Sequence, residues 1–188
     1  MLEVIIHGRG GQGAVTLSQL IAIAAFYEGK YSQAFPVFGI ERRGAPAAAY
    51  VRIDEKPILV RSEIYEADII ILLDPTLISI IDIKKNLKKK GLLLINTDKD
   101  ADVIKKELGL TGCEVNAFDA TSMALQVFKQ NIVNTVMFAF FSTRTKMIHV
   151  NAAYQAIEEK FHGNKELLIL NKKIVGDVFN RLEGSSRC

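Results

Sequence analysis

The sequence has no tryptophan, and its 188 residues include only two cysteines and three histidines. The cysteines, Cys113 and Cys188, are far apart, and neither belongs to a Cys-x-x-Cys pair. This spacing excludes a disulfide framework or an iron–sulfur ligand set built from this chain. The histidines are scattered and show none of the spacings of a zinc site. We therefore expect the chain to carry no metal or cluster of its own.

Long apolar runs and a strong net charge are also missing. The formal net charge is +3, and no basic stripe accompanies it, so nucleic-acid binding is not expected. The apolar stretch at 131–142 is too short to cross a bilayer and contains two asparagines. Residues 2–6 are apolar, but no positively charged segment precedes them, so no signal peptide is predicted. We expect a cytoplasmic protein that does not bind a membrane.

The remaining composition is that of an ordinary globular protein, with 49% hydrophobic and 24% charged residues. The length suits one domain, assigned to residues 1–183, followed by a flexible tail at 184–188. Apolar runs alternate with helical patterns, which predicts an α/β fold with three layers, α/β/α, around a mixed, mostly parallel sheet. The predicted strands are 2–7, 31–35, 46–53, 58–60, 68–73, 91–95 and 113–117. The predicted helices are 14–28, 75–90, 101–108, 123–129, 131–141, 150–161 and 165–182.

A glycine loop follows the first predicted strand. Gly8, Gly10 and Gly13 fit the spacing G-x-G-x-x-G, and Gly11 adds a fourth glycine. Because a predicted helix follows, the loop N–H groups and the helix N-terminus suit the binding of an anion. Arg9 adds a cation to the loop, and Gln12 adds a side-chain amide. The alternative is that these glycines only form a tight turn between strand and helix.

The same glycine spacing occurs in Rossmann-like proteins that bind NAD(P) or FAD. That fold expects an acidic residue about 20 residues further on, at the end of the second strand, to hold the ribose. Here the second predicted strand is followed by Pro36-Val37-Phe38-Gly39, without an acid. Residues 46–53 and 58–60 flank the turn Asp54-Glu55-Lys56-Pro57, which predicts a β-hairpin where a Rossmann fold has a crossover helix. A stand-alone Rossmann-like protein is therefore the second hypothesis.

A second loop, framed by glycines at 39–46, contains Glu41, Arg42, Arg43 and Gly44. Two adjacent arginines present planar donors that suit phosphate or carboxylate groups. The alternative is a solvated loop in which Glu41 neutralises one of the arginines.

Asp74 and Asn134 each have two interpretations. Asp74 ends a predicted strand, where open α/β sheets bind ligands, but an aspartate before Pro75 is also a favoured helix cap. Asn134 lies at the start of an apolar helix and either caps it or lines a ligand cleft. Capping is the preferred interpretation of both residues.

Taken together, the two loops are more specific than either alone. The segments GRGGQGAVTLSQ at 8–19 and SQAFPVFGIERRGAP at 32–46 closely resemble the gamma subunit of 2-oxoacid:ferredoxin oxidoreductases. The resemblance extends along nearly the whole chain. The ERRGAP form resembles the branch of the family that acts on pyruvate or on branched-chain 2-oxoacids such as 2-oxoisovalerate. In single-chain members of the family, the same module is an internal domain.

The resemblance implies a subunit of an enzyme that oxidatively decarboxylates a 2-oxoacid to an acyl-CoA and passes the electrons to ferredoxin. It implies that alpha and beta partners bind thiamine diphosphate and Mg, and that a ferredoxin-like delta partner carries 4Fe–4S clusters. This chain would contribute no catalytic residue and have no activity alone. It would help to form the coenzyme A side of the active site and contact its partners. A third hypothesis is an assembly module without a role in turnover. The residues expected to face a ligand or partner are Gly8, Arg9, Gly10, Gly11, Gln12, Gly13, Glu41, Arg42, Arg43 and Gly44.

Overall fold

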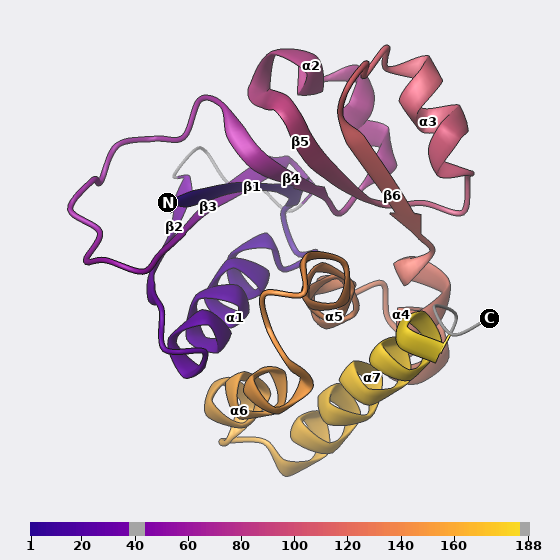
Figure 1. Cartoon of the computed structure of the whole chain (residues 1–188). Helices are drawn as coiled ribbons and strands as arrows, with labels where there is room; N and C mark the ends of the chain where they lie inside the picture. Colours follow the sequence, from indigo (N-terminus) through magenta and orange to yellow (C-terminus); the bar gives the residue numbers. More distant parts are fainter. Residues whose placement is uncertain (38–43, 185–188) are drawn as a thin grey trace.

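The structure, a computed structural model, describes residues 1–37 and 44–184 and centres on a six-stranded sheet (Figure 1). The strand order is β2-β3-β1-β4-β5-β6. Three neighbouring pairs, β1–β4, β4–β5 and β5–β6, are parallel, whereas β3 is antiparallel to both β1 and β2. The prediction of a mixed, mostly parallel sheet is therefore confirmed. The strands are β1 (Leu2–Arg9), β2 (Tyr31–Val37), β3 (Pro46–Asp54), β4 (Ala67–Leu72), β5 (Leu87–Asn96) and β6 (Glu114–Phe118).

Helices cover both faces of the sheet, which confirms the three predicted layers (Figure 1). One face packs against α1 (Ala14–Tyr27), α4 (Ala120–Phe128) and α5 (Asn134–Thr145). On this side, α6 (Val150–Phe161) packs on α1, and α7 (Lys165–Gly184) packs on α5. The other face packs against the 3-10 helix η1 (Pro75–Ser79), α2 (Ile83–Asn86) and α3 (Ala101–Glu107). Two hydrophobic cores therefore lie on opposite faces of one sheet.

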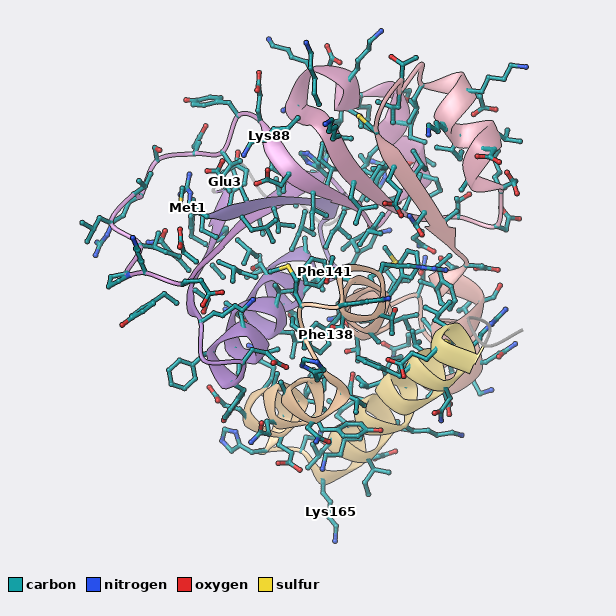
Figure 2. All side chains as sticks on the ribbon, in the orientation of Figure 1. Met1, Glu3, Lys88, Phe138, Phe141 and Lys165 are labelled. Carbon is teal, nitrogen blue, oxygen red and sulfur yellow. The ribbon has the colours of Figure 1, made fainter. Side chains whose placement is uncertain are left out.

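Helix α5 is apolar on all sides because it lies between the sheet and the outer helices. Figure 2 shows Phe141 on the sheet side of α5 and Phe138 on the side of α6 and α7. Both side chains are fully buried. The interpretation of this segment as a buried helix is confirmed. Its aromatic residues pack against the sheet on one side and against the outer helices α6 and α7 on the other.

The predicted hairpin between residues 46–53 and 58–60 is wrong. β3 instead pairs along one edge with β1 and along the other edge with β2. Both hydrogen-bonding edges of β3 are therefore occupied, and no edge is left for residues 58–60. That segment is a loop in which Leu59 is 88% exposed. The antiparallel hairpin of this fold is the β2–β3 pair, on either side of residues 38–45.

The predicted helix at 75–90 is also wrong. Only the short helices η1 and α2 form there, and β5 begins at Leu87. Lysines at the end of this segment suit a helix C-terminus, but only Lys84 and Lys85 lie in a helix, α2, whereas Lys88, Lys89 and Lys90 lie on β5. Lys88 Nζ lies 3.1 Å from Glu3 Oε2 on β1 and 3.0 Å from Asp68 Oδ2 on β4. These contacts join three neighbouring strands, so the lysine is placed by tertiary ion pairs and not by a helix dipole.

A buried arginine completes this charged cluster of Glu3, Arg52, Asp68 and Lys88. Arg52 has a side chain only 1% exposed, and its Nε lies 3.1 Å from Glu3 Oε1. Its Nη1 has no hydrogen-bond partner in the described part of the chain. Figure 2 shows Glu3 and Lys88 beside Met1, at the amino-terminal end of β1. Glu3 is thus the single carboxylate that contacts the buried guanidinium among the described residues.

Candidate functional site

The candidate site lies where the chain leaves the sheet in two opposite directions. After β1 the chain enters α1 on one face, and after β4 it enters η1 on the other face. β1 and β4 are adjacent and parallel, so their carboxyl ends lie side by side. Open α/β sheets bind ligands at such a switch point. The glycine loop and Asp74 both lie at this edge.

The glycine loop is held against the segment that enters β3. The Gly10 N–H donates to Ala45 O at 2.8 Å, and the Gly44 N–H donates to Gly10 O at 3.1 Å. The two loops that the sequence singled out therefore meet at Gly10 and Gly44. Gly8 is closely packed, since a Cβ added to it would lie 3.0 Å from Leu73 Cδ1. Glu41, Arg42 and Arg43 lie outside the described residues.

Arg9 does not extend into solvent as an unpaired cation. Its Nη2 donates to Thr76 Oγ1 at 2.7 Å, and its Nη1 donates to Gly44 O at 3.2 Å. Its Nε lies 3.2 Å from Asp74 Oδ2. One guanidinium group therefore ties the glycine loop to η1 and to the segment before β3. This gives Arg9 a positioning role that its place in the glycine motif did not reveal.

Gln12 connects the same groups through its side-chain amide. Its Oε1 accepts a hydrogen bond from the Arg9 N–H at 2.8 Å, and its Nε2 donates to Asp74 Oδ2 at 2.9 Å. The bond to Arg9 closes the loop on itself, and the bond to Asp74 links it to β4. The loop is thereby held in one conformation by side chains from both sides of the switch point.

Asp74 caps η1, which confirms the capping interpretation. Its Oδ1 accepts from the Thr76 N–H at 2.9 Å and from Thr76 Oγ1 at 2.6 Å. Burial acts to raise the pKa of Asp74, but the hydrogen bonds from Thr76 and Gln12 and the charge of Arg9 outweigh it and lower the pKa. Asp74 is therefore a stable carboxylate at neutral pH, suited to holding the loop and not to donating a proton.

His7 lies two residues before Arg9 on β1, and its Nε2 is buried without a hydrogen-bond partner among the described residues. Burial lowers the pKa of His7 from 6.5 to about 4. Between pH 6.5 and about pH 4, the unfolded chain therefore binds a proton at His7 that the folded chain does not bind. The folded state is then fully stabilised above pH 6.5 and loses stability as the pH falls toward 4.

Between pH 7 and pH 5 we expect His7 to reduce the free energy of unfolding by about 2 kcal/mol. Urea denaturation at both pH values, with wild type and His7→Gln, measures this. The His7→Gln variant is expected to lose little stability between pH 7 and pH 5. The pKa of Asp74 is lowered in the folded chain, so the stability that Asp74 contributes is lost only at pH values below this interval. Equal losses in the two proteins would show that His7 does not cause the pH dependence.

Asn134 from α5 lies on the other side of the glycine loop. A Cβ added to Gly13 would lie 2.5 Å from Asn134 Nδ2, so the loop and the start of α5 are in close contact. Helix α5 begins at Asn134 itself, so its N-cap position is occupied by Val133, and no side chain caps the helix. The prediction that Asn134 is the N-cap residue is therefore wrong, although its side-chain oxygen accepts a hydrogen bond from the adjacent Thr135 N–H at 2.7 Å.

Several residues near the loop were not identified from the sequence. Thr76 follows Asp74-Pro75, and its hydroxyl gave no signal of a contact with Arg9. Lys160 and Asn171 reach the same region from α6 and α7. More than 60 residues separate Arg9 from Thr76 in the chain, so no local spacing connects them.

Two further properties bear on cofactors and membranes. Among residues 1–37 and 44–184, no group of three or more His, Cys, Asp or Glu side chains is placed to hold a metal ion. Over the same described ranges, none of the helices combines the length and apolar character needed to span a bilayer.

Comparison with known proteins identifies the family. The family "Pyruvate ferredoxin/flavodoxin oxidoreductase" matches residues 3–180. "Pyruvate/ketoisovalerate oxidoreductases common subunit gamma" of Thermococcus kodakarensis is 41% identical over 96% of this chain and 97% of its own length. "Pyruvate synthase subunit PorC" of Methanocaldococcus jannaschii is 47% identical over 87% of this chain and 88% of its own length. The crystal structure of pyruvate oxidoreductase subunit PORC from Thermotoga maritima has a TM-score of 0.81 and 36% identity, covering 95% of each chain. The chain therefore belongs to the pyruvate ferredoxin/flavodoxin oxidoreductase family, among its gamma-type subunits.

Proposed function

We propose that this chain is the gamma subunit of a multi-subunit enzyme that oxidatively decarboxylates pyruvate or a related 2-oxoacid, makes an acyl-CoA and passes electrons to ferredoxin. Support comes from the similarity to subunits of pyruvate and ketoisovalerate oxidoreductases along almost the full length of both chains. In this proposal, alpha and beta partners bind thiamine diphosphate and Mg, and a delta partner carries the 4Fe–4S clusters. The chain has no activity alone.

A direct role in the active site is supported by two loops that meet at the sheet edge, the glycine loop after β1 and the segment before β3. Arg9, Gln12 and Asp74 hold the glycine loop rigid, and Gly10 is hydrogen-bonded to Gly44 and Ala45. A rigid edge of this kind loses little conformational entropy when it binds a ligand. In the sequence, Arg42 and Arg43 directly precede Gly44. We assign the coenzyme A side of the active site to this edge, with the two arginines contacting phosphate groups.

The Rossmann-like alternative is not favoured by the fold. In that fold, the strand beside β1 is parallel to it and ends in the ribose-binding acid. Here the neighbour of β1 on that side is the antiparallel strand β3, which begins at this edge with Pro46. The described residues next to it, Gly44 and Ala45, carry no carboxylate.

The proposal is tested in the complex reconstituted with its partner subunits, by measuring 2-oxoacid-dependent dye reduction. The double substitution Arg42→Ala/Arg43→Ala is expected to raise the KM for coenzyme A by roughly tenfold or more, because each arginine–phosphate contact is a charge-assisted hydrogen bond. The KM for the 2-oxoacid is expected to stay unchanged.

Arg61→Ala is the matched control. Arg61 is exposed, and it lies in the loop between the carboxyl end of β3 and the amino end of β4, at the opposite edge of the sheet. An unchanged KM for coenzyme A in the double variant, together with weaker assembly of the complex, would favour the assembly-module hypothesis. Full acyl-CoA production by a complex that lacks this chain would refute both.

A further inference from the structure

A surface of unpaired lysines lies on the side of the sheet that carries α2 and α3 (Figure 1). Within the described part of the chain, none of these lysines forms an ion pair. All are exposed except Lys105, which is half-buried. We call this set the lysine patch: Lys84 and Lys85 of α2, Lys89 and Lys90 of β5, and Lys105 and Lys106 of α3.

Tertiary packing brings the two segments of the lysine patch together. Lys84 Nζ lies 4.0 Å from the position that a Cβ on Gly109 would occupy. Gly109 follows the C-cap of α3, and its N–H donates to Lys106 O at 3.2 Å. The α2 lysine therefore reaches the last turn of α3, which contains Lys105 and Lys106. The patch is continuous in space although its segments are separate in the sequence.

An irregular stretch of β5 holds two of the lysines in solvent. Ala67 pairs with Leu87 and Ile69 pairs with Leu92, so the stretch at 88–91 is longer than the part of β4 beside it. Lys89 and Lys90 are exposed there. Lys90 has a φ of 66°, in the left-handed region that a lysine adopts only with strain. The fold therefore keeps these two charges at the surface at a conformational cost.

The nearest acidic residues in the sequence are engaged elsewhere. Asp82 caps α2 by accepting a hydrogen bond from the Lys85 backbone N–H at 3.0 Å. Glu107 lies 3.6 Å from Lys99 Nζ. The net charge of the whole chain is +3, so six lysines exceed it and the rest of the chain is net negative. The positive charge is therefore concentrated on one side of the molecule.

Helix dipoles explain only part of the lysine patch. Lysines in the last turns of α2 and α3 interact favourably with the negative ends of those helices. Lys89 and Lys90 lie on a strand, where no such dipole acts. A surface of this charge attracts a negatively charged partner over several ångströms of solvent.

The composition of this region indicates the class of partner. Residues 80–112 contain no aromatic residue and no arginine. Single-stranded nucleic acids are bound by aromatic stacking, and duplex DNA is commonly read by arginine. Permanent subunit interfaces are rich in apolar side chains and poor in lysine. Hydrated lysine charges instead suit an acidic protein surface that binds quickly and dissociates quickly.

We propose that the lysine patch is a docking surface for the soluble electron-carrier protein of the enzyme, which binds through carboxylates on its own surface. This rests on the proposed function, because a carrier such as ferredoxin binds and dissociates in every turnover. Opposite charges raise the rate of such encounters. The chain contributes the docking surface, and the electrons come from the clusters of the delta partner.

The test uses the reconstituted complex with the triple substitution Lys84→Gln/Lys89→Gln/Lys106→Gln, which removes one lysine from each element of the patch. At low ionic strength the KM for ferredoxin is expected to rise by roughly tenfold or more. The kcat and the rate of methyl viologen reduction are expected to stay within about twofold of wild type. Added salt is expected to raise the KM for ferredoxin of wild type more steeply than that of the variant.

Lys129→Gln/Lys165→Gln/Lys173→Gln is the matched control. It removes the same charge from exposed positions on α7 and at the C-cap of α4, which belong to the helix layers on the other side of the sheet. Its KM for ferredoxin is expected to stay within about twofold of wild type. An unchanged KM in the patch variant, or equal increases in both variants, would overturn the proposal.

Two other outcomes are distinguished by the same proteins. If the patch variant keeps its KM for ferredoxin but loses binding to phosphatidylglycerol vesicles or to duplex DNA, the proposal is overturned in favour of a membrane or a nucleic acid. Failure of the proposed function appears separately, as a wild-type complex that does not reduce methyl viologen with a 2-oxoacid and coenzyme A. With that activity present, an unchanged KM for ferredoxin counts against the lysine patch alone.

Discussion

Replacing Glu3 by glutamine is expected to lower the free energy of unfolding by about 3 kcal/mol, because it leaves a buried arginine without its counter-charge. The Arg52 side chain is 1% exposed, and Glu3 is the carboxylate that contacts its guanidinium, at 3.1 Å. The carbonyl of Glu63 is the other acceptor near it, at 3.4 Å from Nη2, and carries no net charge. A neutral glutamine retains a hydrogen bond but no longer offsets the cost of keeping the positive charge out of water. Urea denaturation at pH 7 measures the loss.

Asp68→Asn is the matched control for this prediction. Asp68 belongs to the same charged cluster and contacts Lys88 at 3.0 Å, but it does not contact Arg52. Its side chain is 33% exposed, so we expect a loss below about 1 kcal/mol. In the double variant Glu3→Gln/Arg52→Met, most of the stability is expected to return, because an apolar side chain of similar length replaces the buried charge. Equal losses for Glu3→Gln and Asp68→Asn would contradict the prediction.

Gly13→Ala is expected to lower the free energy of unfolding by about 3 kcal/mol, from two separate causes. The first is the backbone, since Gly13 has a φ of 87°, in the left-handed region that an alanine adopts only with strain. The second is a collision, because the new Cβ would lie 2.5 Å from Asn134 Nδ2 and 3.0 Å from its Cβ and Cγ. Rotating the Asn134 amide cannot relieve contacts with Cβ, so the helix itself must shift. Thermal and urea denaturation measure the loss.

Gly11→Ala separates the two causes. Gly11 has a φ of 99°, but an added Cβ would meet no atom within 4 Å. This variant therefore introduces only the backbone strain, and we expect a loss of about 1 kcal/mol. Combining Gly13→Ala with Asn134→Ala is expected to recover about 1–2 kcal/mol, because the collision with the amide is removed. The absence of any coupling between the two positions would show that the collision does not set the cost.

Much of the fold was predictable because its signals are local. The apolar run of β1, the glycines and the alanine-rich α1 follow one another directly, and each signal acts within a few residues. The Asp74-Pro75 pair predicted a cap for the same reason, since a cap involves only neighbouring residues. The α5 segment was correctly predicted as a buried helix because apolar residues occupy every side of it.

The errors arose where one segment has a choice of partners. Residues 58–60 have the character of a strand, but both edges of β3 were already paired with β1 and β2. The lysines at 88–90 suit a helix C-terminus, but pairing of Lys88 with Glu3 and Asp68, and burial of Leu87, place them on β5. Competition for hydrogen-bonding edges and for ion pairs involves residues far apart in the chain, so local preference does not reveal which partner prevails.

The candidate site divides in the same way. Local sequence was sufficient to place the glycine loop between a strand and a helix, because glycine spacing, strand and helix signals are contiguous. Packing in three dimensions decided that Arg9 is bound to Thr76 and Asp74 and that Gly10 is bonded to Ala45. It also decided that Asn134 closes the far side of the loop. These contacts join segments separated by 35 to more than 100 residues, and they form only when the sheet brings the carboxyl ends of its strands to one edge.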